Sequence, residues 1–210
     1  MSNIIVLSKR EPCPEGYISI DTTSRNPDVT LKKGLSPFYL GPVSCYDGLT
    51  AANVENAWQY SKVYPKHLDE HGEPTDEYFV WRNQGFKKTF ADRYPMGKGE
   101  IPKYSYWKVE DKYQKLDYIE ARKELYVPLY AKAVVKTPAF EYLKSKVDNG
   151  DNIALIDFDG YNHESLGMSL FDVINCKSKK MGHAFVLSML LQGKIIIKDD
   201  KVVDLDGLLQ

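Results

Sequence analysis

The chain opens with short apolar runs and continues with longer stretches of helical periodicity. In the first fifty residues, prolines and glycines separate the apolar runs. This pattern predicts strands over residues 4–7, 17–20 and 43–46, and a later apolar run predicts a strand over residues 153–157. Between and after them, apolar spacing and flanking caps predict helices over residues 51–63, 74–85, 117–135, 138–147 and 181–192.

Prolines and glycines mark the ends of several predicted elements. We expect Pro65 to end the first helix, Pro128 to break the long stretch over 117–135, and Gly193 to stop the last helix. The last helix is almost wholly apolar, so we expect it to be buried. Two short runs after it have the pattern of a hairpin, over residues 194–198 and 201–204. No internal repeat or low-complexity linker interrupts residues 1–210, so we expect a single domain. The predicted elements together make it a mostly helical α+β domain with short strands.

Composition excludes several classes of protein. The 210 residues carry 28 Lys and Arg against 29 Asp and Glu, a formal net charge of −1, which argues against a nucleic-acid coat or a polybasic membrane binder. No apolar run approaches the roughly 18 residues that a membrane span needs. Three widely spaced cysteines, Cys13, Cys45 and Cys176, have no metal-binding spacing. We therefore predict a cytoplasmic protein with no membrane partner, no metal and no cofactor.

Charge is unevenly distributed along the chain. Residues 82–123 contain 11 basic and 6 acidic residues, a net charge of +5. Such a stretch is either a solvated helix face or a local phosphate site. Gly97 and Gly99 lie beside Arg93 and Lys98, and glycines let backbone N–H groups approach an anion, which favours the phosphate site. The segment lacks the Gly-Lys-Ser/Thr ending of a P-loop.

A polar stripe follows the first predicted helix. Glu55, Gln59 and Lys62 stand at positions i, i+4 and i+7, which places them on one face. A stripe of this kind is ordinarily a solvent face with a weak ion pair. The rigid, apolar segment over residues 35–42 and the neighbouring rings of Trp58 and Tyr60 favour a pocket instead.

The same segments resemble the NADAR family, the YbiA-like N-glycosidases associated with NAD and ADP-ribose. The resemblance is carried by Leu35-Ser36-Pro37-Phe38-Tyr39 and by Glu55-Asn56-Ala57-Trp58-Gln59-Tyr60-Ser61-Lys62. Further matches keep their order and cover roughly residues 34–191: Arg93-Tyr94-Pro95-Met96-Gly97-Lys98 through Trp107, residues 121–126 and 137–143, Asp157 before Gly160, Asn175, and Met181-Gly182. Two departures stand out, because the family's Glu-His is Glu55-Asn56 here and its Trp-Gly is missing after Asp157.

The resemblance implies an activity: hydrolysis of N-glycosidic bonds in ribose-phosphate compounds, including ADP-ribose attached to guanine bases of nucleic acid. Such a bond breaks through a transition state resembling an oxocarbenium ion, which a carboxylate stabilises. Glu55 is expected to be that carboxylate. Lys62 would neutralise phosphate, orient Glu55 or attack the opened sugar as an amine. Asp157 or Asp159 would bind ribose hydroxyls or serve as the second carboxylate.

The resemblance also implies residues that hold the substrate. Arg93 and Lys98 would take phosphate, and a ring from Trp107, Tyr60 or Trp81 would stack on the base. The full set expected to bind a nucleotide or ADP-ribosylated substrate is Ser36, Phe38, Asn56, Gln59, Arg93, Lys98, Trp107, Asn175 and Gly182.

Other interpretations stay open. Asp157-x-Asp159-Gly160 also resembles a haloacid-type phosphatase motif, although the partner motifs of that chemistry are missing. We expect His183, on the apolar last helix, to be a core histidine, and His163 to be the better acid–base candidate. At the level of the whole protein, the alternatives are an inactive pocket that sequesters a nucleotide and a phage counter-defence protein that acts through an interaction. The departures from the family pattern favour the first of these, the inactive pocket, and no sequence feature identifies a protein partner.

Overall fold

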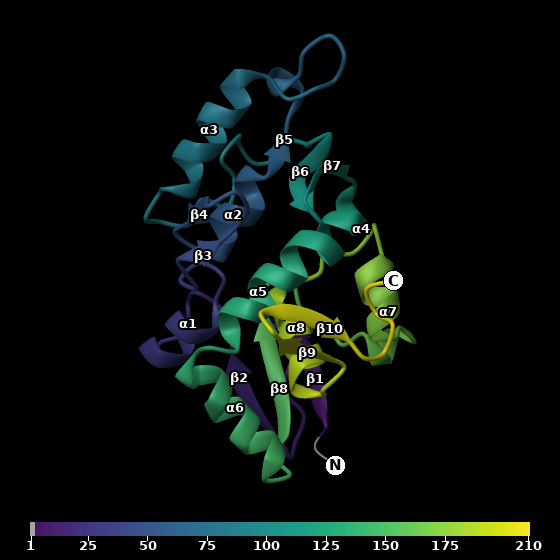
Figure 1. Cartoon of the computed structure of the whole chain (residues 1–210). Helices are drawn as coiled ribbons and strands as arrows, with labels where there is room; N and C mark the ends of the chain where they lie inside the picture. The colour runs from purple at the N-terminus through teal and green to yellow at the C-terminus, as the bar shows by residue number, and fades with distance from the viewer. Residues whose placement is uncertain (1–2) are drawn as a thin grey trace.

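The computed structural model describes residues 3–210, in which helices and short strands form a mixed α+β fold (Figure 1). The α+β class expected from the sequence is therefore confirmed. The helices are α1 Val29–Leu35, α2 Val54–Tyr60, α3 Asp76–Phe86, α4 Tyr118–Ala121, α5 Val127–Val134, α6 Pro138–Asp148, α7 Leu170–Asn175 and α8 His183–Leu191. The strands are β1 Ile4–Ser8, β2 Tyr17–Asp21, β3 Val43–Ser44, β4 Thr50–Ala51, β5 Lys62–Val63, β6 Tyr104–Val109, β7 Lys112–Leu116, β8 Asn152–Asp157, β9 Ile195–Lys198 and β10 Lys201–Asp204.

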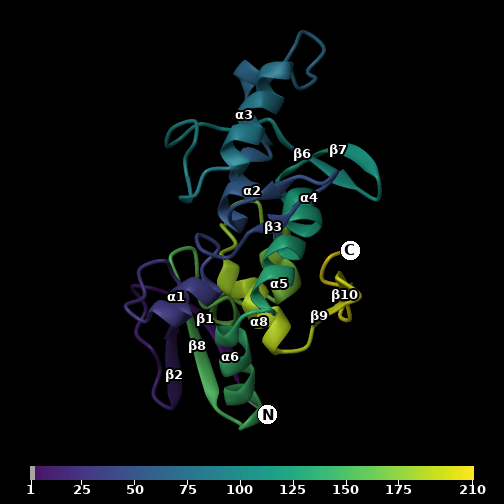
Figure 2. The same cartoon turned by 60° about the vertical axis from the view of Figure 1, so that its left-hand side comes forward.

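A three-stranded parallel sheet with the order β1-β8-β2 forms the lower part of the molecule in Figure 1. Successive side chains of a strand point to opposite faces. Ile4 and Val6 therefore enter the main core, while Ile5 and Leu7 form a small cluster on the other face. Helix α8 packs against β1 and β8, and α6 packs against β8 (Figure 2). Because all three strands run the same way, their carboxyl ends meet at one edge, where Asp157 ends β8.

Helix α8 lies at the centre of the main core. All of its residues except Leu191 are buried, as expected from its apolar sequence. It begins at His183 with Gly182 as its N-cap, two residues later than predicted. No helix among residues 3–210 is long and apolar enough to cross a membrane.

Helix α2 is shorter at both ends than the helix predicted over residues 51–63. Its N-cap is Asn53, whose side chain accepts a hydrogen bond from the Asn56 amide, and residues 50–51 form strand β4 before it. At the other end the chain leaves the helix at Ser61. Lys62 and Val63 then pair with β6 as strand β5. Lys62 is therefore a strand residue, and the predicted two-turn stripe spans a helix and the strand that follows it.

The break predicted at Pro128 does not occur. A π-helical segment, Arg122–Tyr126, joins α4 to α5, and Pro128 lies in the first turn of α5. Backbone N–H groups at that position lack a regular α-helical partner, so proline is tolerated there. The helical run therefore continues through the proline and connects the two parts of the molecule seen in Figure 1.

Several elements carry weak sequence signals and were not predicted. The β6–β7 hairpin turns through Glu110 and Asp111, both with positive φ, where glycine or asparagine is the usual signal. Helices α1 and α7 are short, and the strand predicted over residues 43–46 is reduced to β3. The strand β8, the helix α6 and the β9–β10 hairpin agree with the sequence pattern.

Candidate functional site

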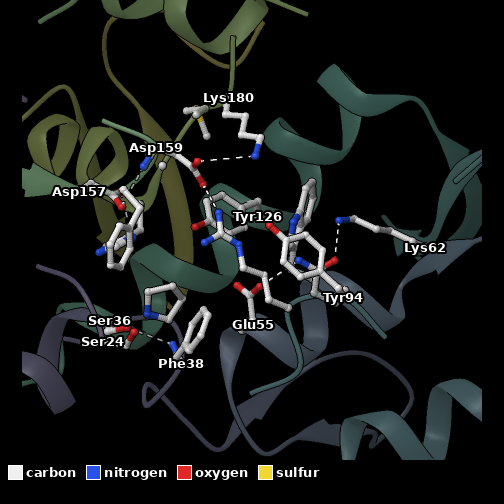
Figure 3. Close-up of a pocket in the computed structure, with 18 of the residues that line it drawn as sticks. Ser24, Ser36, Phe38, Glu55, Lys62, Tyr94, Tyr126, Asp157, Asp159 and Lys180 are labelled. Atoms are coloured by element: carbon white, nitrogen blue, oxygen red, sulfur yellow. Dashed lines mark hydrogen bonds and ion pairs between the residues drawn. The ribbon is translucent and has the colours of Figure 1, made fainter. Parts of the chain in front are cut away.

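A cavity of about 710 Å³ lies at the carboxyl end of β8 (Figure 3). Helix α2 and the helical run through Arg122–Tyr126 supply two of its walls. The other walls are mostly loops: residues 23–25 after β2, 36–38 after α1, the glycine-containing loop over 93–102, residues 157–159 at the end of β8, and residues 180–183 at the start of α8. In parallel sheets, ligands commonly bind at the carboxyl ends of the strands.

A chain of hydrogen bonds runs along the α2 wall. The Lys62 Nζ donates to Gln59 Oε1 at 2.7 Å, and the Gln59 Nε2 donates to Glu55 Oε1 at 2.9 Å. The Lys62 Nζ also lies 4.7 Å from the centre of the Trp58 ring. Gln59 therefore holds the carboxylate and the amine in fixed positions on the same wall, although Lys62 has left the helix.

The cavity changes the acidity of both ends of this chain. Glu55 is only 6% exposed, and burial raises the pKa of its carboxyl group, although Gln59 and the positive charge of Lys62 act in the opposite direction. Burial also lowers the pKa of the Lys62 amine to about 8, against the opposing attraction of Glu55. A substantial fraction of Lys62 is therefore an uncharged amine slightly above neutral pH.

Asp157 and His183 form a buried pair at the end of β8. The His183 Nδ1 lies 3.1 Å from Asp157 Oδ2, and the other ring nitrogen lies 2.9 Å from the Thr22 carbonyl oxygen. Asp157 Oδ2 also accepts a hydrogen bond from the Ala184 amide, at the start of α8. A Cβ at position 182 would lie 2.1 Å from that oxygen, so the glycine makes room for the carboxylate.

Both partners in this pair are biased towards their charged forms. Burial alone would raise the pKa of Asp157, but the His183 charge and hydrogen bond hold it below its usual value. Burial alone would lower the pKa of His183, but Asp157 raises it above 6.5. The imidazole is thus a satisfied, charged partner of Asp157, close to the core role expected for it, and it also lines the cavity.

Replacing Asp157 by Asn should destabilise the fold in a pH-dependent way. The raised His183 pKa stabilises the folded state fully below about 6.5, and this stabilisation is lost as pH rises through the folded value. The lowered pKa of Asp157 also stabilises the folded state, fully above about pH 4, and this stabilisation is lost at lower pH. We expect a loss of about 3 kcal/mol in the free energy of unfolding near pH 5.5, and a smaller loss at pH 9. Urea unfolding at both pH values measures it; an equal loss at both would contradict a charged pair.

The second acidic residue of the loop, Asp159, is surrounded by cations. Its Oδ2 lies 2.8 Å from the Arg93 Nη2, and its Oδ1 lies 3.8 Å from the Lys180 Nζ. Figure 3 shows the Lys180 side chain pointing toward Asp159. Arg25 also lines the cavity, with its guanidinium 5.3 Å from the centre of the Phe158 ring. These cations give one side of the cavity the charge that a phosphate group needs.

The structure brings most of the predicted site residues to this cavity. Those that line it are Ser36, Phe38, Glu55, Gln59, Lys62, Arg93, Asp157, Asp159 and Gly182. Four others, Asn56, Lys98, Trp107 and Asn175, do not line it.

Each of the four has another structural position. Asn56 is fully buried on the far side of α2, where its amide donates to the Lys88 and Phe90 carbonyls and accepts from the Asp92 amide. Trp107 is buried on β6 against Tyr46, with ring centres 4.7 Å apart. Lys98 is exposed, although the glycines beside it line the cavity. Asn175 ends α7, and its amide donates to the Phe171 carbonyl within that helix.

The other rings proposed for stacking are also elsewhere. Tyr60 is buried and donates to Asp92, and Trp81 packs against it with ring centres 4.6 Å apart. His163 is buried beside Phe185 and does not line the cavity. The aromatic side chains that do line it include Phe38, Trp58 and Tyr126.

Sequence reasoning missed several cavity residues. Tertiary contacts bring Arg25, Tyr118, Arg122, Tyr126 and Lys180 to the site. The most constrained of them is Arg122, which is 1% exposed and donates to the carbonyls of Val173, Ile174, Cys176 and Lys179. For Tyr118, Arg122 and Tyr126 the local signal is the aromatic and basic composition of residues 118–126. Arg25 and Lys180 have no comparable signal.

Among residues 3–210, no three His, Cys, Asp or Glu side chains cluster as they would around a metal ion. In comparisons with known proteins, no family model, no curated protein and no solved structure matches the chain.

Proposed function

We propose that the protein is an N-glycosidase that cleaves the bond between a base and a ribose-phosphate, with ADP-ribose attached to guanine as the substrate class. The observation that supports this most strongly is the buried chain from Glu55 through Gln59 to Lys62. It presents a carboxylate and a weakly basic amine to one cavity. The resemblance to the NADAR family adds support, because its expected Glu and Lys are these two residues.

In this proposal, Glu55 and Lys62, the two ends of the hydrogen-bonded chain through Gln59, have different roles. As the bond to the base weakens, positive charge develops on the ribose, and the Glu55 carboxylate stabilises it. The Lys62 amine attacks C1′, and its lowered pKa supports this role because only the uncharged amine is a nucleophile. Gln59 keeps the two groups apart and oriented.

The cationic side of the cavity suits the phosphates of such a substrate. Arg93 and Lys180 approach the two oxygens of Asp159, so they are held in place before a substrate arrives. The same contacts argue against the phosphatase interpretation of Asp157-x-Asp159. Asp157 is engaged by His183 and Ala184, and Asp159 by cations, which leaves neither oriented as a free nucleophile.

Binding of phosphate should depend on Arg93 and not on Lys98. Arg93→Ala removes a charge-assisted donor from the cavity, and we expect the affinity for ADP-ribose to fall about tenfold or more. Lys98→Ala is the matched control from the same loop and should bind as the unchanged protein does. Titration calorimetry measures both, and the affinity of the unchanged protein should fall as salt rises. Equal losses in both variants would move the phosphate site out of the cavity.

The proposed function is tested by identifying which bond of the substrate the protein cleaves. The protein is incubated with an ADP-ribosylated guanine oligonucleotide and with free nucleotides, and the products are identified by mass spectrometry. The proposal expects a free base or an unmodified guanine strand together with intact ADP-ribose. Release of inorganic phosphate would instead support the phosphatase interpretation, and tight binding with no product would support the sequestering pocket.

A further inference from the structure

One polar group in the cavity has no role so far: the hydroxyl of Tyr126. The side chain is only 7% exposed, yet it lines the cavity. No group among residues 3–210 forms a hydrogen bond with this hydroxyl. Other buried polar atoms that lack a partner are completely enclosed by protein, whereas this hydroxyl is not. A buried phenol normally has a partner, so a hydroxyl left free at a cavity wall is available for a bound molecule.

The ring of Tyr126 is held firmly. It lies 5.1 Å from the centre of the Trp58 ring and 6.5 Å from that of Tyr130. Tyr130 is itself fixed by a 2.8 Å hydrogen bond to the Leu35 carbonyl. The backbone of Tyr126 closes the π-helical segment, an irregularity often found at functional sites. The hydroxyl therefore has a fixed position before any ligand binds.

The charges around this hydroxyl determine what it can do. Glu55, Asp157 and Asp159 all act on it, and Figure 3 shows Tyr126 between Asp159 and Glu55. Burial and these carboxylates raise the pKa of Tyr126 well above its usual value, so it keeps its proton. The other donors nearby have other roles: Arg93 and Lys180 are cations that suit phosphate, and Lys62 supplies the attacking amine. Tyr126 is an uncharged donor set beside the Trp58 ring, which suits a base.

On the basis of the proposed function, we propose that Tyr126 donates a hydrogen bond to the base as it departs. The bond between C1′ and the base nitrogen breaks, and its electron pair stays on the base. C1′ bonds to the Lys62 amine, the proton released by that amine passes to Glu55 or solvent, and the base takes up a proton from solvent. Water then hydrolyses the bond between C1′ and Lys62, which regenerates the amine and releases ADP-ribose. The phenol keeps its own proton throughout and stabilises the negative charge that develops on the base.

Tyr126→Phe tests this role because it keeps the ring and removes only the hydroxyl. On an ADP-ribosylated guanine oligonucleotide, we expect kcat to fall about 10²-fold, as when one donor to a developing anion is removed, with KM nearly unchanged. On NAD⁺, whose nicotinamide nitrogen is already positive and leaves neutral, no anion develops, and the loss should stay below about fivefold. The melting temperature should not fall, because the hydroxyl bonds no protein group. Tyr142→Phe, on the exposed face of α6, is the control and should change neither rate.

The outcomes separate this inference from the proposed function. A Tyr126→Phe variant with normal kcat on the guanine substrate would overturn the donor role while leaving the proposed function intact. So would a loss confined to KM, or an equal loss with both leaving groups. If the unchanged protein cleaves guanine adducts but not NAD⁺, the guanine substrate alone tests the donor role. A loss in kcat supports that role, and a loss confined to KM overturns it. If the unchanged protein cleaves neither substrate, the proposed function fails, and the donor role fails with it.

Discussion

Glu55→Gln is expected to lower the rate of base release by 10²–10⁴-fold while the fold stays intact. The substitution preserves size and helix propensity and removes only the charge. The neutral amide cannot stabilise a positive ribose, and the residue is too buried for water to replace the carboxylate. Burial has already raised the pKa of Glu55, so its ionised form costs energy in the folded protein. Removing that charge should therefore not destabilise the protein.

The rate is measured as turnover at saturating substrate, and the stability is measured by thermal unfolding. Glu141→Gln, on the exposed face of α6, is the matched control and should leave both unchanged. Near-normal turnover in Glu55→Gln would remove this carboxylate from the chemistry. A large fall in stability would instead mean that the attraction between Glu55 and Lys62, which act on each other across Gln59, supports the fold.

Lys62→Ala is expected to have an effect of similar size, a loss of 10³-fold or more, because it removes the attacking amine. It also removes the positive charge that lowers the pKa of Glu55, so a larger share of the carboxyl becomes protonated. Stability should not fall through the loss of the charge. The Lys62 pKa is lowered by folding, so at pH 7 the protonated form favours the unfolded chain.

The pH dependence distinguishes an amine from a fixed cation. If the uncharged amine attacks, the rate of the unchanged protein should rise as pH passes about 8, the pKa of Lys62. If Lys62 acts only through its charge, the rate should fall there. Borohydride should trap a sugar adduct on Lys62 in the first case. Lys62→Arg should rescue little, since Arg is bulkier and stays protonated, and Lys144→Ala on α6 is the silent control.

Local patterns predicted the elements whose signals lie within a few residues. Helix α6 has a Thr-Pro start, α8 is almost continuously apolar, and β8 follows a glycine turn, and each was predicted close to its observed bounds. The β6–β7 hairpin was missed because Glu110, the first residue of its turn, is a weak signal for the left-handed conformation that it adopts. The β9–β10 hairpin was predicted because its turn has aspartate at both positions, Asp199 and Asp200, and aspartate tolerates that conformation better.

The residues of the candidate site likewise fall into those that a local pattern predicts and those that it does not. Glu55 and Gln59 could be found from helical spacing, since one turn of α2 places both on the cavity wall. Asn56 was assigned to the site through the family resemblance, because it follows Glu55 where the family has a histidine. In a helix, however, adjacent residues point in different directions, and its amide instead holds residues 88–92. Tyr126 and Lys180 reach the cavity through packing of distant segments, which no short pattern encodes.

A single-turnover experiment followed by mass spectrometry tests whether Glu55 and Lys62 cleave the bond between ADP-ribose and guanine. Excess protein is mixed with an ADP-ribosylated guanine oligonucleotide, and bound and cleaved material are measured in the same sample for the unchanged protein, Glu55→Gln and Lys62→Ala. We expect complete release of ADP-ribose from an unmodified strand by the unchanged protein, and bound but intact substrate in Glu55→Gln. Intact substrate with all three proteins, bound in a way that depends on Lys62, would contradict this expectation and leave a pocket that only sequesters its ligand.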